Sequence, residues 1–307
     1  MISVVVPNFN SAALLKKNLP RLLELLGKSG LEYELIVADD ASTDDSLKIV
    51  EAIESDIKIV RSVKNTGFAG NVDRGIRAAK GGIVYTIKTD AIPEKAEYFK
   101  LLSAHFKDPR VFAVSAALKT KENGKQELRG SGEIYFEKGF FLHRRGNDSA
   151  IMTAWADGSA SAFRRDLYLK IGGFDGLYNP FYWEDTDLGY RAWKAEYKID
   201  YEPRAVLLHD FESGVIAGHY TKKQIETISL RNQFIFVWKN GDFKHILTYF
   251  LWEPYHDLVA VKNRNWAFFE AWWQAALCLP GILVARWRQK ALVKLSDDQV
   301  LRLLSSG

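Results

Sequence analysis

Short runs of β-branched residues alternate with amphipathic stretches along the N-terminal part of the chain. The runs predict strands at residues 2–7, 34–38, 57–60, 83–88 and 111–116. Leucines recur at helical spacing after the first run, and the intervening stretches predict helices at residues 12–26, 42–55 and 69–79. Strand and helix in this rhythm predict right-handed βαβ crossovers and a mostly parallel sheet.

The residues that directly follow these strands are expected to carry the chemistry, because ligands bind outside the carboxyl ends of such strands. Asparagines and paired aspartates stand there, at residues 7–10, 39–40, 64–67 and 88–90. A dinucleotide site would show Gly-x-Gly-x-x-Gly after the first strand, but residues 7–11 contain no glycine and the chain has no P-loop. Carboxylates can instead accept from a ribose hydroxyl or a base N–H, or hold a divalent cation that binds a diphosphate.

The composition is that of a globular protein, with 47% hydrophobic and 26% charged residues. The 42 Lys and Arg residues exceed the 38 Asp and Glu residues by four, too small a surplus for nucleic acid as the main partner. The single cysteine, Cys278, excludes a disulfide framework and a cysteine-based zinc site and fits a reducing cytoplasm. The chain begins with a strand-like run, so we expect no signal peptide and a cytoplasmic location.

The charge and the tryptophans are unevenly placed. Residues 1–210 hold 30 basic and 30 acidic residues, whereas residues 211–307 hold 12 and 8 and therefore carry the whole +4. Six of the nine tryptophans also lie in residues 211–307. This distribution predicts a neutral body followed by a basic, tryptophan-rich helical appendage.

Five sequence blocks resemble family 2 glycosyltransferases, in the same order along the chain. They are Val-Val-Val-Pro-Asn-Phe-Asn at 4–10, Val-Ala-Asp-Asp-Ala-Ser-Thr-Asp at 37–44, Asn-Thr-Gly-Phe-Ala-Gly-Asn at 65–71, Gly-Gly-Phe-Asp at 172–175 and Trp-Glu-Asp-Thr-Asp-Leu-Gly-Tyr-Arg at 183–191. The resemblance covers about residues 1–240, includes Arg231 and Asn232, and is nearest to the rhamnosyl- and galactofuranosyl-transferase-like branch.

The resemblance implies a GT-A-like α/β fold: a Rossmann-related, mixed but mainly parallel sheet flanked by helices, with a C-terminal helical appendage. We expect residues 1–95 to form the nucleotide-sugar-binding half and residues 96–210 the acceptor and catalytic half. Residues 211–307 are the expected helical region, associated with a membrane surface.

The resemblance also implies a donor site. Pro7, Asn8 and Phe9 would line the base pocket, with Asp39 or Asp40 bonding the base or ribose. The alternative for the aspartates of this block is capping of the following helix. The diphosphate-sugar end would be approached by Asn65, Phe68, Asn71 and, on the sugar side, Asp157.

The fourth strand end departs from the family. Where the family has an Asp-x-Asp-like motif that holds Mn²⁺ or Mg²⁺, this chain has Lys88-Thr89-Asp90. Lys88 either pairs with the diphosphate in place of part of the metal's charge or marks a lost metal site. His209 is similar to the family's third metal ligand, so Asp90 and His209 are the expected ligands of a divalent cation.

The resemblance assigns the catalytic base to Asp185, which would accept the proton of the acceptor hydroxyl in a transfer with inversion. Adjacent helical residues do not share a face, so Glu184 cannot serve in the same way. Trp183, Glu184 and Arg191 are expected on the acceptor side.

The C-terminal region carries a tryptophan-rich apolar run at residues 266–285, followed by Arg286, Arg288, Lys290 and Lys294. The run is broken by Pro280 and is shorter than the ~20 apolar residues of a membrane span. Tryptophans beside a basic cluster are typical of a helix at a membrane interface. The alternative is a helix packed on the body with its tryptophans in the core.

Together these features predict an inverting hexosyltransferase-type enzyme. It would move a sugar from a UDP- or dTDP-sugar to a glycan acceptor in cell-surface polysaccharide synthesis. If the C-terminal region lies at a membrane interface, we expect this acceptor to be lipid-linked. The alternative is a non-catalytic protein that binds sugar nucleotides or glycans and has a degraded metal motif.

Overall fold

The computed structural model describes residues 1–53, 56–122, 125–147, 149–209 and 220–305. Its centre is a nine-stranded sheet with the order β3-β2-β1-β4-β10-β6-β11-β5, and β7 pairs with β6. The strands are β1 (Ile2–Asn8), β2 (Tyr33–Asp39), β3 (Lys58–Arg61), β4 (Ile83–Ile87), β5 (Ala91–Pro93), β6 (Val111–Glu122), β7 (Lys125–Arg129), β10 (Ala160–Arg164) and β11 (Lys198–His209). All five predicted strands are confirmed.

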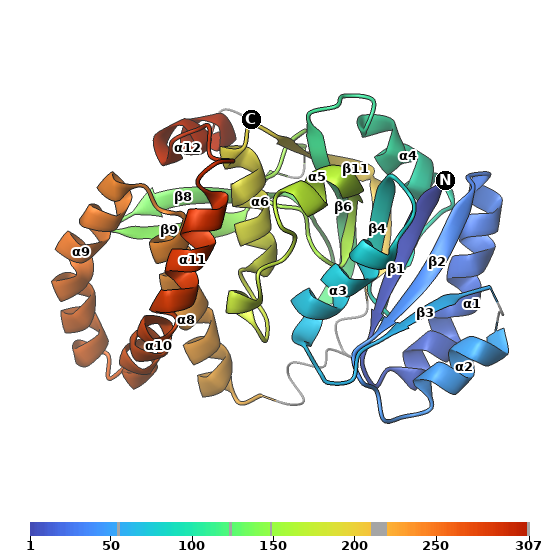
Figure 1. Ribbon diagram of the computed structural model, residues 1–307, viewed down its shortest axis with the longest axis horizontal. Helices are drawn as coiled ribbons and strands as arrows, with labels where there is room; N and C mark the ends of the chain where they lie inside the picture. The colour runs from blue at the N-terminus through green and yellow to red at the C-terminus, as the bar shows by residue number, and fades with distance from the viewer. Residues whose placement is uncertain (54–55, 123–124, 148, 210–219, 306–307) are drawn as a thin grey trace.

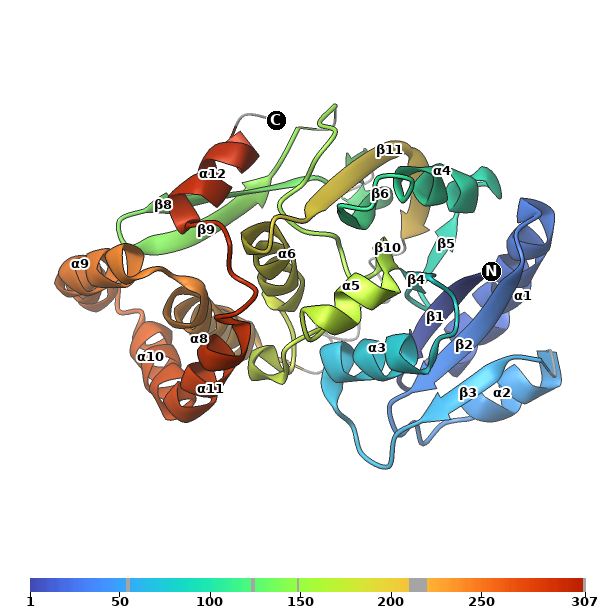
Figure 2. The ribbon, with the colours of Figure 1, turned by 45° about the horizontal axis from the view of Figure 1, so that its top comes forward.

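Helices cover both faces of the sheet (Figures 1 and 2). One face packs through Val4 and Val6 against the leucines of α1 and the aromatic side chains of α4, and the other packs through Val5 against α3. The alternation of side chains along β1 therefore feeds two separate cores. The helices around the sheet are α1 (Ala12–Ser29), α2 (Ser46–Ile53), α3 (Gly67–Ala78), α4 (Glu97–His105), α5 (Arg165–Lys170) and α6 (Glu184–Lys194).

The second helix begins later than the sequence predicted, at Ser46 rather than residue 42. Ser42 Oγ accepts hydrogen bonds from Asn8 Nδ2 and Asn10 N, and Asp44 accepts from Ala12 N and Ser46 N. These contacts hold residues 42–45 outside the helix: Ser42 binds the segment after β1, and Asp44 binds the first N–H groups of both α1 and α2.

Two antiparallel pairings bring distant segments to one edge of the sheet. β10 runs antiparallel to β4 with Ala160 opposite Ile87, so the residues before Ala160 lie beside those after Ile87. β11 pairs with β5 so that His209 lies opposite Ala91. Strands from before and after residue 95 belong to the same sheet. The division of the chain into regions at residues 95 and 210 stays a prediction.

The remaining elements lie at the end of the molecule opposite β1–β3 (Figure 1). They are the hairpin β8 (Gly132–Glu137) and β9 (Phe140–Arg145), the short helix η1 (Gly176–Tyr178), and α8 (Lys222–Asn240), α9 (Phe243–Lys262), α10 (Trp266–Leu277), α11 (Leu279–Gln289) and α12 (Asp297–Ser305). α8 is the central helix of this region, because every residue from Phe234 to Asn240 is buried.

Within the described residues, no single helix is long and apolar enough to cross a bilayer. The pair α10 and α11, which is bent by 60° at a short break, meets the length and composition of a span only when the two are taken together.

Candidate active site

Polar residues from five strands meet at one edge of the sheet. β1, β2 and β4 are parallel, so Asn8, Asp39 and Lys88 stand at the same ends. The antiparallel β10 presents its beginning there, with Asp157 just before it, and β11 ends there at His209. The pairing of strands thus gathers residues that are up to 200 positions apart in the sequence.

Asn8 of the predicted base pocket contacts Asp39, which is expected to bond the base or ribose. Asn8 Nδ2 donates to Asp39 Oδ1 at 2.8 Å, and both side chains are buried. Asn8 Oδ1 is buried but accepts no hydrogen bond from the part of the chain that the structure describes. An unsatisfied buried acceptor is costly, so this oxygen suits an N–H or O–H group of a ligand. Pro7 is buried beside it and Phe9 is half-buried.

Asp40 and Asn71 are engaged within the protein. Asp40 accepts from Thr66 N at 2.8 Å and from Arg74 Nη2 at 3.2 Å. Asn71 Nδ2 donates to the carbonyls of Asn8 and Ala38 at the ends of β1 and β2. These contacts tie α3 to two strand ends. They give both residues a supporting position, and their predicted contact with the nucleotide stays untested.

Arg74 is part of this support and was missed by the sequence analysis. Its guanidinium contacts Asp40, Asn71 and Thr66, with Thr66 Oγ1 at 2.7 Å. Its spacing of three from Asn71, on one helical face, was the only local signal. Asn65, by contrast, is exposed, and its Oδ1 accepts from Gly67 N at 2.9 Å.

Lys88 is held over an aromatic ring. Its Nζ lies 4.6 Å from the centre of the Phe68 ring, a cation–π distance. A Cβ on Gly158 would approach Phe68 Cε1 to 2.8 Å, so the chain next to Asp157 also lies against this ring. The three predicted donor residues Phe68, Lys88 and Asp157 therefore come together.

Asp90 and His209 also come together, with 3.4 Å between Asp90 Oδ1 and His209 Nε2. Burial opposes ionisation of Asp90, but His209 and Lys88 outweigh it and lower the pKa of that carboxyl. Asp90 Oδ1 is buried and, apart from this contact with His209, accepts no hydrogen bond from the described residues. An ionised, buried carboxylate beside an imidazole fits a divalent cation that keeps other positions for diphosphate oxygens and water.

Glu184 and Asp185 open α6, where the helix dipole favours negative charge. Burial nevertheless raises the pKa of Glu184 to about 8, with the charge of Asp185 adding to it. Burial and the charge of Asp157 raise the pKa of Asp185 to about 7. A half-buried carboxyl with this pKa can accept a proton near neutral pH.

The loop before α6 is strained and externally braced. Tyr182 and Trp183 both have left-handed backbone angles, φ 69° and 72°, which are unfavourable for bulky residues. Asn232 Nδ2 of α8 lies 2.9 Å from each of three carbonyl oxygens of the loop, those of Tyr178, Phe181 and Tyr182. Arg231 donates to Asn179 O in the same loop. The family-like pair on α8 thus shapes the start of α6.

Arg191 makes its polar contacts within the protein, and its predicted place on the acceptor side stays a prediction. It is buried, and its guanidinium donates to Asp187 and to the carbonyls of Ile171 and Gly173 at 2.7–2.8 Å. Asp187 also binds Lys239 at 2.8 Å, and these cations outweigh its burial and lower its pKa to about 2. These contacts give Arg191 a structural place in the anchoring of α6. Trp183 is buried, with its ring 4.8 Å from that of His143.

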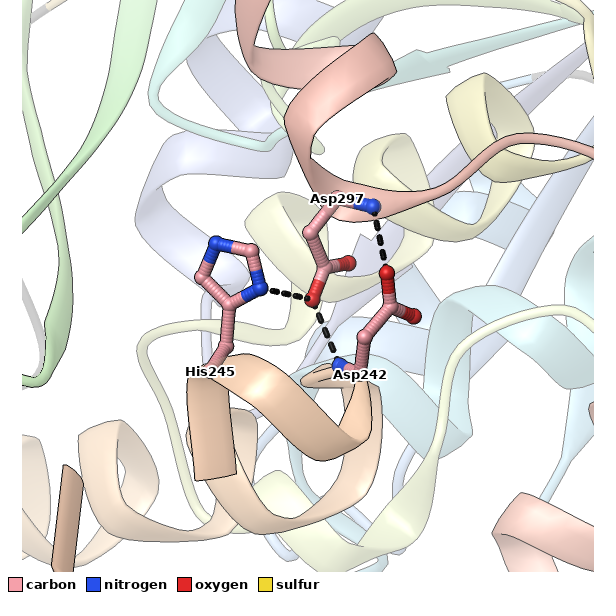
Figure 3. Close-up of side chains that lie close together, drawn as sticks. All are labelled: Asp242, His245 and Asp297. Atoms are coloured by element: carbon pink, nitrogen blue, oxygen red, sulfur yellow. Dashed lines mark hydrogen bonds and ion pairs between the residues drawn. The ribbon is translucent and has the colours of Figure 1, made fainter. Parts of the chain in front are cut away.

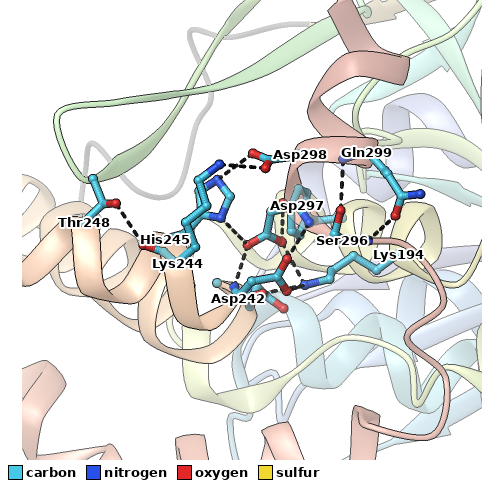
Figure 4. A network of polar contacts seen from close by, with 12 residues as sticks. Lys194, Asp242, Lys244, His245, Thr248, Ser296, Asp297, Asp298 and Gln299 are labelled. Atoms are coloured by element: carbon cyan, nitrogen blue, oxygen red, sulfur yellow. Dashed lines mark hydrogen bonds and ion pairs between the residues drawn. The ribbon is translucent and has the colours of Figure 1, made fainter.

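A second group of metal-ligating side chains lies outside this edge. Asp242, His245 and Asp297 join α9 to the start of α12 (Figure 3). Asp242 and Asp297 each accept from the backbone N–H of the other, at 2.8 and 2.6 Å, and Lys194 Nζ lies 2.8–2.9 Å from both carboxylates. Figure 4 shows the group with a neighbouring contact, in which Lys244 Nζ donates to Asp298 Oδ2. Because these oxygens already accept hydrogen bonds from protein donors, the group acts as a clamp between helices.

Comparison with known proteins gives a match to the family Glycosyl transferase family 2 over residues 3–172. A hyaluronan synthase from Pasteurella multocida is 29% identical over 227 residues, which are 63% of this chain and 23% of that protein. The chain spans 22–56% of the length of the first three curated relatives.

Two solved structures show the fold. Staphylococcus aureus TarS residues 1–349 with UDP-GlcNAc has a TM-score of 0.57 at 18% identity, covering 95% of this chain and 83% of that one. The mannosyltransferase PcManGT from Pyrobaculum calidifontis, with GDP-Man and Mn²⁺, has a TM-score of 0.56 at 19% identity and covers 95% and 84%. They confirm the predicted GT-A-like fold class.

Proposed function

This chain belongs to glycosyl transferase family 2, and on that basis we propose that it transfers a hexose-type sugar from a nucleoside-diphosphate donor to a glycan acceptor with inversion. The observation that carries this proposal is the position of Asp185. It begins a helix at the edge where Lys88 and Asp157 meet, and its pKa of about 7 suits proton transfer. The family match and the fold support the reaction class.

Each of these residues has a role in the proposed reaction. Asn8 and Asp39 orient the base or ribose at the ends of β1 and β2. Lys88 places a positive charge against the diphosphate. Asp185 takes the proton of the attacking hydroxyl, on the side opposite to the departing diphosphate, while Glu184 stays protonated in its buried site. The direct in-line attack of the hydroxyl is what inverts the anomeric carbon.

Asp90 and His209 are the proposed ligands of a divalent cation, Mg²⁺ or Mn²⁺. The buried Asp90 Oδ1 and the 3.4 Å approach of His209 Nε2 to it support this fit. A cation bound there would neutralise charge on the diphosphate. Mn²⁺ accompanies GDP-Man in the structure of PcManGT. Because Lys88 supplies one charge itself, we propose a partial rather than an absolute dependence on metal.

The proposed donor carries a uridine or deoxythymidine diphosphate. UDP-GlcNAc in the TarS structure supports the first of these. Because PcManGT contains GDP-Man, a guanine nucleotide sugar is the donor to compare with them. The proposed acceptor is a glycan of a cell-surface polysaccharide, carried on a lipid at the inner face of the cell membrane. The polysaccharide synthase among the relatives supports a glycan acceptor.

Donor binding and donor consumption test the proposal separately. Thermal shift with UDP-GlcNAc, dTDP-rhamnose and GDP-mannose, each with and without Mn²⁺, should select one base. Release of the nucleoside diphosphate from that donor should then fall in Asp185→Asn, and the anomeric configuration of the product should be opposite to that of the donor. Binding with equal, negligible release by the wild type and Asp185→Asn would favour the non-catalytic alternative. Absence of all binding would overturn the proposal.

A further inference from the structure

Helix α9 presents a continuous apolar stripe to the outside. Six of its exposed large side chains recur at helical spacings of three, four and seven, on one face of the helix. Leu251 and Leu258 are 72% and 71% exposed, and Phe243 is 81% exposed. The stripe consists of Phe243, Leu247, Phe250, Leu251, Leu258 and Val261. An unshielded stripe of this length on a folded protein indicates a binding surface.

The next two helices extend this surface. Trp273 and Leu277 of α10 are 63% and 69% exposed, and Leu283 and Trp287 of α11 are 63% and 77% exposed. We call these side chains, together with the stripe on α9, the α9–α11 face. Figures 1 and 2 place the three helices together, at the end of the molecule opposite β1–β3.

The opposite sides of these helices are fixed to the protein. Ala271 and Ala275 of α10 and Ile282 of α11 are buried in the same core as α8. Arg286 Nη1 lies 2.9 Å from each of three carbonyl oxygens at the end of α8, those of Trp238, Lys239 and Gly241. The bent pair α10–α11 is therefore locked in place, and only its outer side can meet a partner.

The charges around the face favour a lipid surface over a second copy of the chain. Exposed cations lie at the ends of α9 and α11, Lys262 and Arg264 at the first and Arg288 and Lys290 at the second. Glu270, the exposed acid within α10, lies 3.3 Å from Lys223 and is thus balanced. A second copy would bring cation against cation, whereas anionic headgroups complement these charges. Tryptophans beside cations suit the headgroup layer.

We propose that the α9–α11 face docks on the surface of an anionic bilayer without crossing it. The locked inner sides of α10 and α11 fix the depth, because only the exposed side chains can enter the lipid. This docking rests on the proposed function for its purpose, which is to hold the site beside a lipid-linked acceptor. Its chemistry rests on the exposed side chains alone.

The test measures binding of the full chain to vesicles of phosphatidylcholine with one-third phosphatidylglycerol, by co-sedimentation. The double variants Leu251→Ser/Leu258→Ser and Trp273→Ser/Trp287→Ser should each weaken binding about tenfold or more, because apolar area no longer enters the lipid. The matched control is Val63→Ser/Ile151→Ser, which replaces side chains that are 100% and 72% exposed outside the face. The control should bind as the wild type does. Unchanged Tm values would show that all variants fold.

Charge is tested with Arg288→Gln/Lys290→Gln, which should weaken binding to these vesicles but not to pure phosphatidylcholine. Lys107→Gln, an exposed cation at the end of α4, is the control. Equal binding by wild type and face variants would overturn the proposal, as would a dimer in light scattering that the face variants dissolve. Binding of UDP-GlcNAc or GDP-mannose without vesicles reports on the donor site alone, so failure of docking and failure of the proposed function are distinguishable.

Discussion

Lys88 Nζ lies 4.6 Å from the centre of the Phe68 ring, and this contact joins the end of β4 to the first turn of α3. The resemblance to the family predicts the first acid of a metal motif at this position. A flexible side chain is thus held in one place, at the edge where Asp90 and Asp185 also lie. A cation fixed in this way fits a phosphate-binding role better than a residue left behind by a lost metal site.

Replacement of Lys88 should therefore weaken the donor rather than the fold. Lys88→Ala is expected to raise the Kd of the bound nucleotide sugar about tenfold, because a charge-assisted contact with the diphosphate is lost. Activity should then depend more strongly on Mn²⁺, and Lys88→Asp should bind Mn²⁺ more tightly than the wild type. Isothermal titration calorimetry measures the affinities for the nucleotide sugar and for Mn²⁺. Lys95→Ala, an exposed lysine before α4, is the control. Unchanged diphosphate affinity in Lys88→Ala would make the lysine incidental.

The pKa of Asp185 should set the pH dependence of activity, and replacement of Asp157 should shift it. Activity should rise with pH through about 7, because Asp185 must lose its proton to act as a base. Asp157→Asn removes a negative charge that raises this pKa, so the acidic limb of kcat/KM should move to lower pH. Asp185→Asn should lower kcat about 10²-fold or more at all pH values while the donor still binds. A limb that stays in place in Asp157→Asn would contradict the assignment.

Glu184 should make the protein less stable as the pH rises. Burial raises its pKa to about 8 in the folded protein, whereas the unfolded chain ionises it near its ordinary value of about 4.3. Between these values the folded state binds more protons than the unfolded state, so stability falls as pH increases. Glu184→Gln cannot ionise and should be more stable than the wild type at pH 8 by about 2 kcal/mol or more, with little difference at pH 4.5. Calorimetry at both pH values checks this, and a constant difference would rule it out.

The sequence predicted what local patterns and ordered motifs encode. The five N-terminal strands, and with them the positions of Asn8 and Asp39, follow from β-branched runs and their ends. It did not predict that β10 inserts antiparallel between β4 and β6, which is what brings Asp157 beside Lys88. Such pairing is set by tertiary packing, which short sequence windows do not contain.

The contacts of the supporting residues also depend on tertiary packing, so the sequence did not predict them. The place of Arg191 in a motif did not show that its guanidinium binds the carbonyls of Ile171 and Gly173, and its expected place on the acceptor side stays a prediction. Helix α8 is buried on all sides from Phe234 onward, because α10 and α11 cover it. The appendage that the sequence treated as one run therefore has both a core and an exposed apolar side.

Asn232 should be needed for the shape of the site rather than for chemistry. Asn232→Ala would leave the carbonyls of Tyr178, Phe181 and Tyr182 without their shared donor, at a cost of about 1–3 kcal/mol. The strained turn before Asp185 would relax, so we expect a lower Tm and a lower kcat with little change in the donor Kd. Asn263→Ala, an exposed asparagine after α9, is the control. Unchanged kcat in Asn232→Ala would show that the turn holds its shape without it.

Of the two groups of potential metal ligands, only Asp90 and His209 should contribute to stabilisation by a divalent cation. Mn²⁺ with a bound nucleotide sugar should raise the Tm of the wild type, because a ligand of the folded state stabilises it. Asp90→Asn and His209→Gln should lose this increase, since they remove the proposed ligands. Asp242→Asn should keep it, because Lys194 and backbone N–H groups already occupy the clamp at Asp242 and Asp297.

The clamp should instead be sensitive to loss of its own charges. Asp297→Ala would leave Lys194, whose side chain is 6% exposed, with Asp242 as its remaining carboxylate. A buried charge deprived of a partner costs about 3–5 kcal/mol, so the Tm should fall by several degrees in the absence of any metal. EDTA should leave the Tm of the ligand-free wild type unchanged. A fall in that Tm on chelation, abolished by Asp242→Asn, would show instead that the clamp holds an ion.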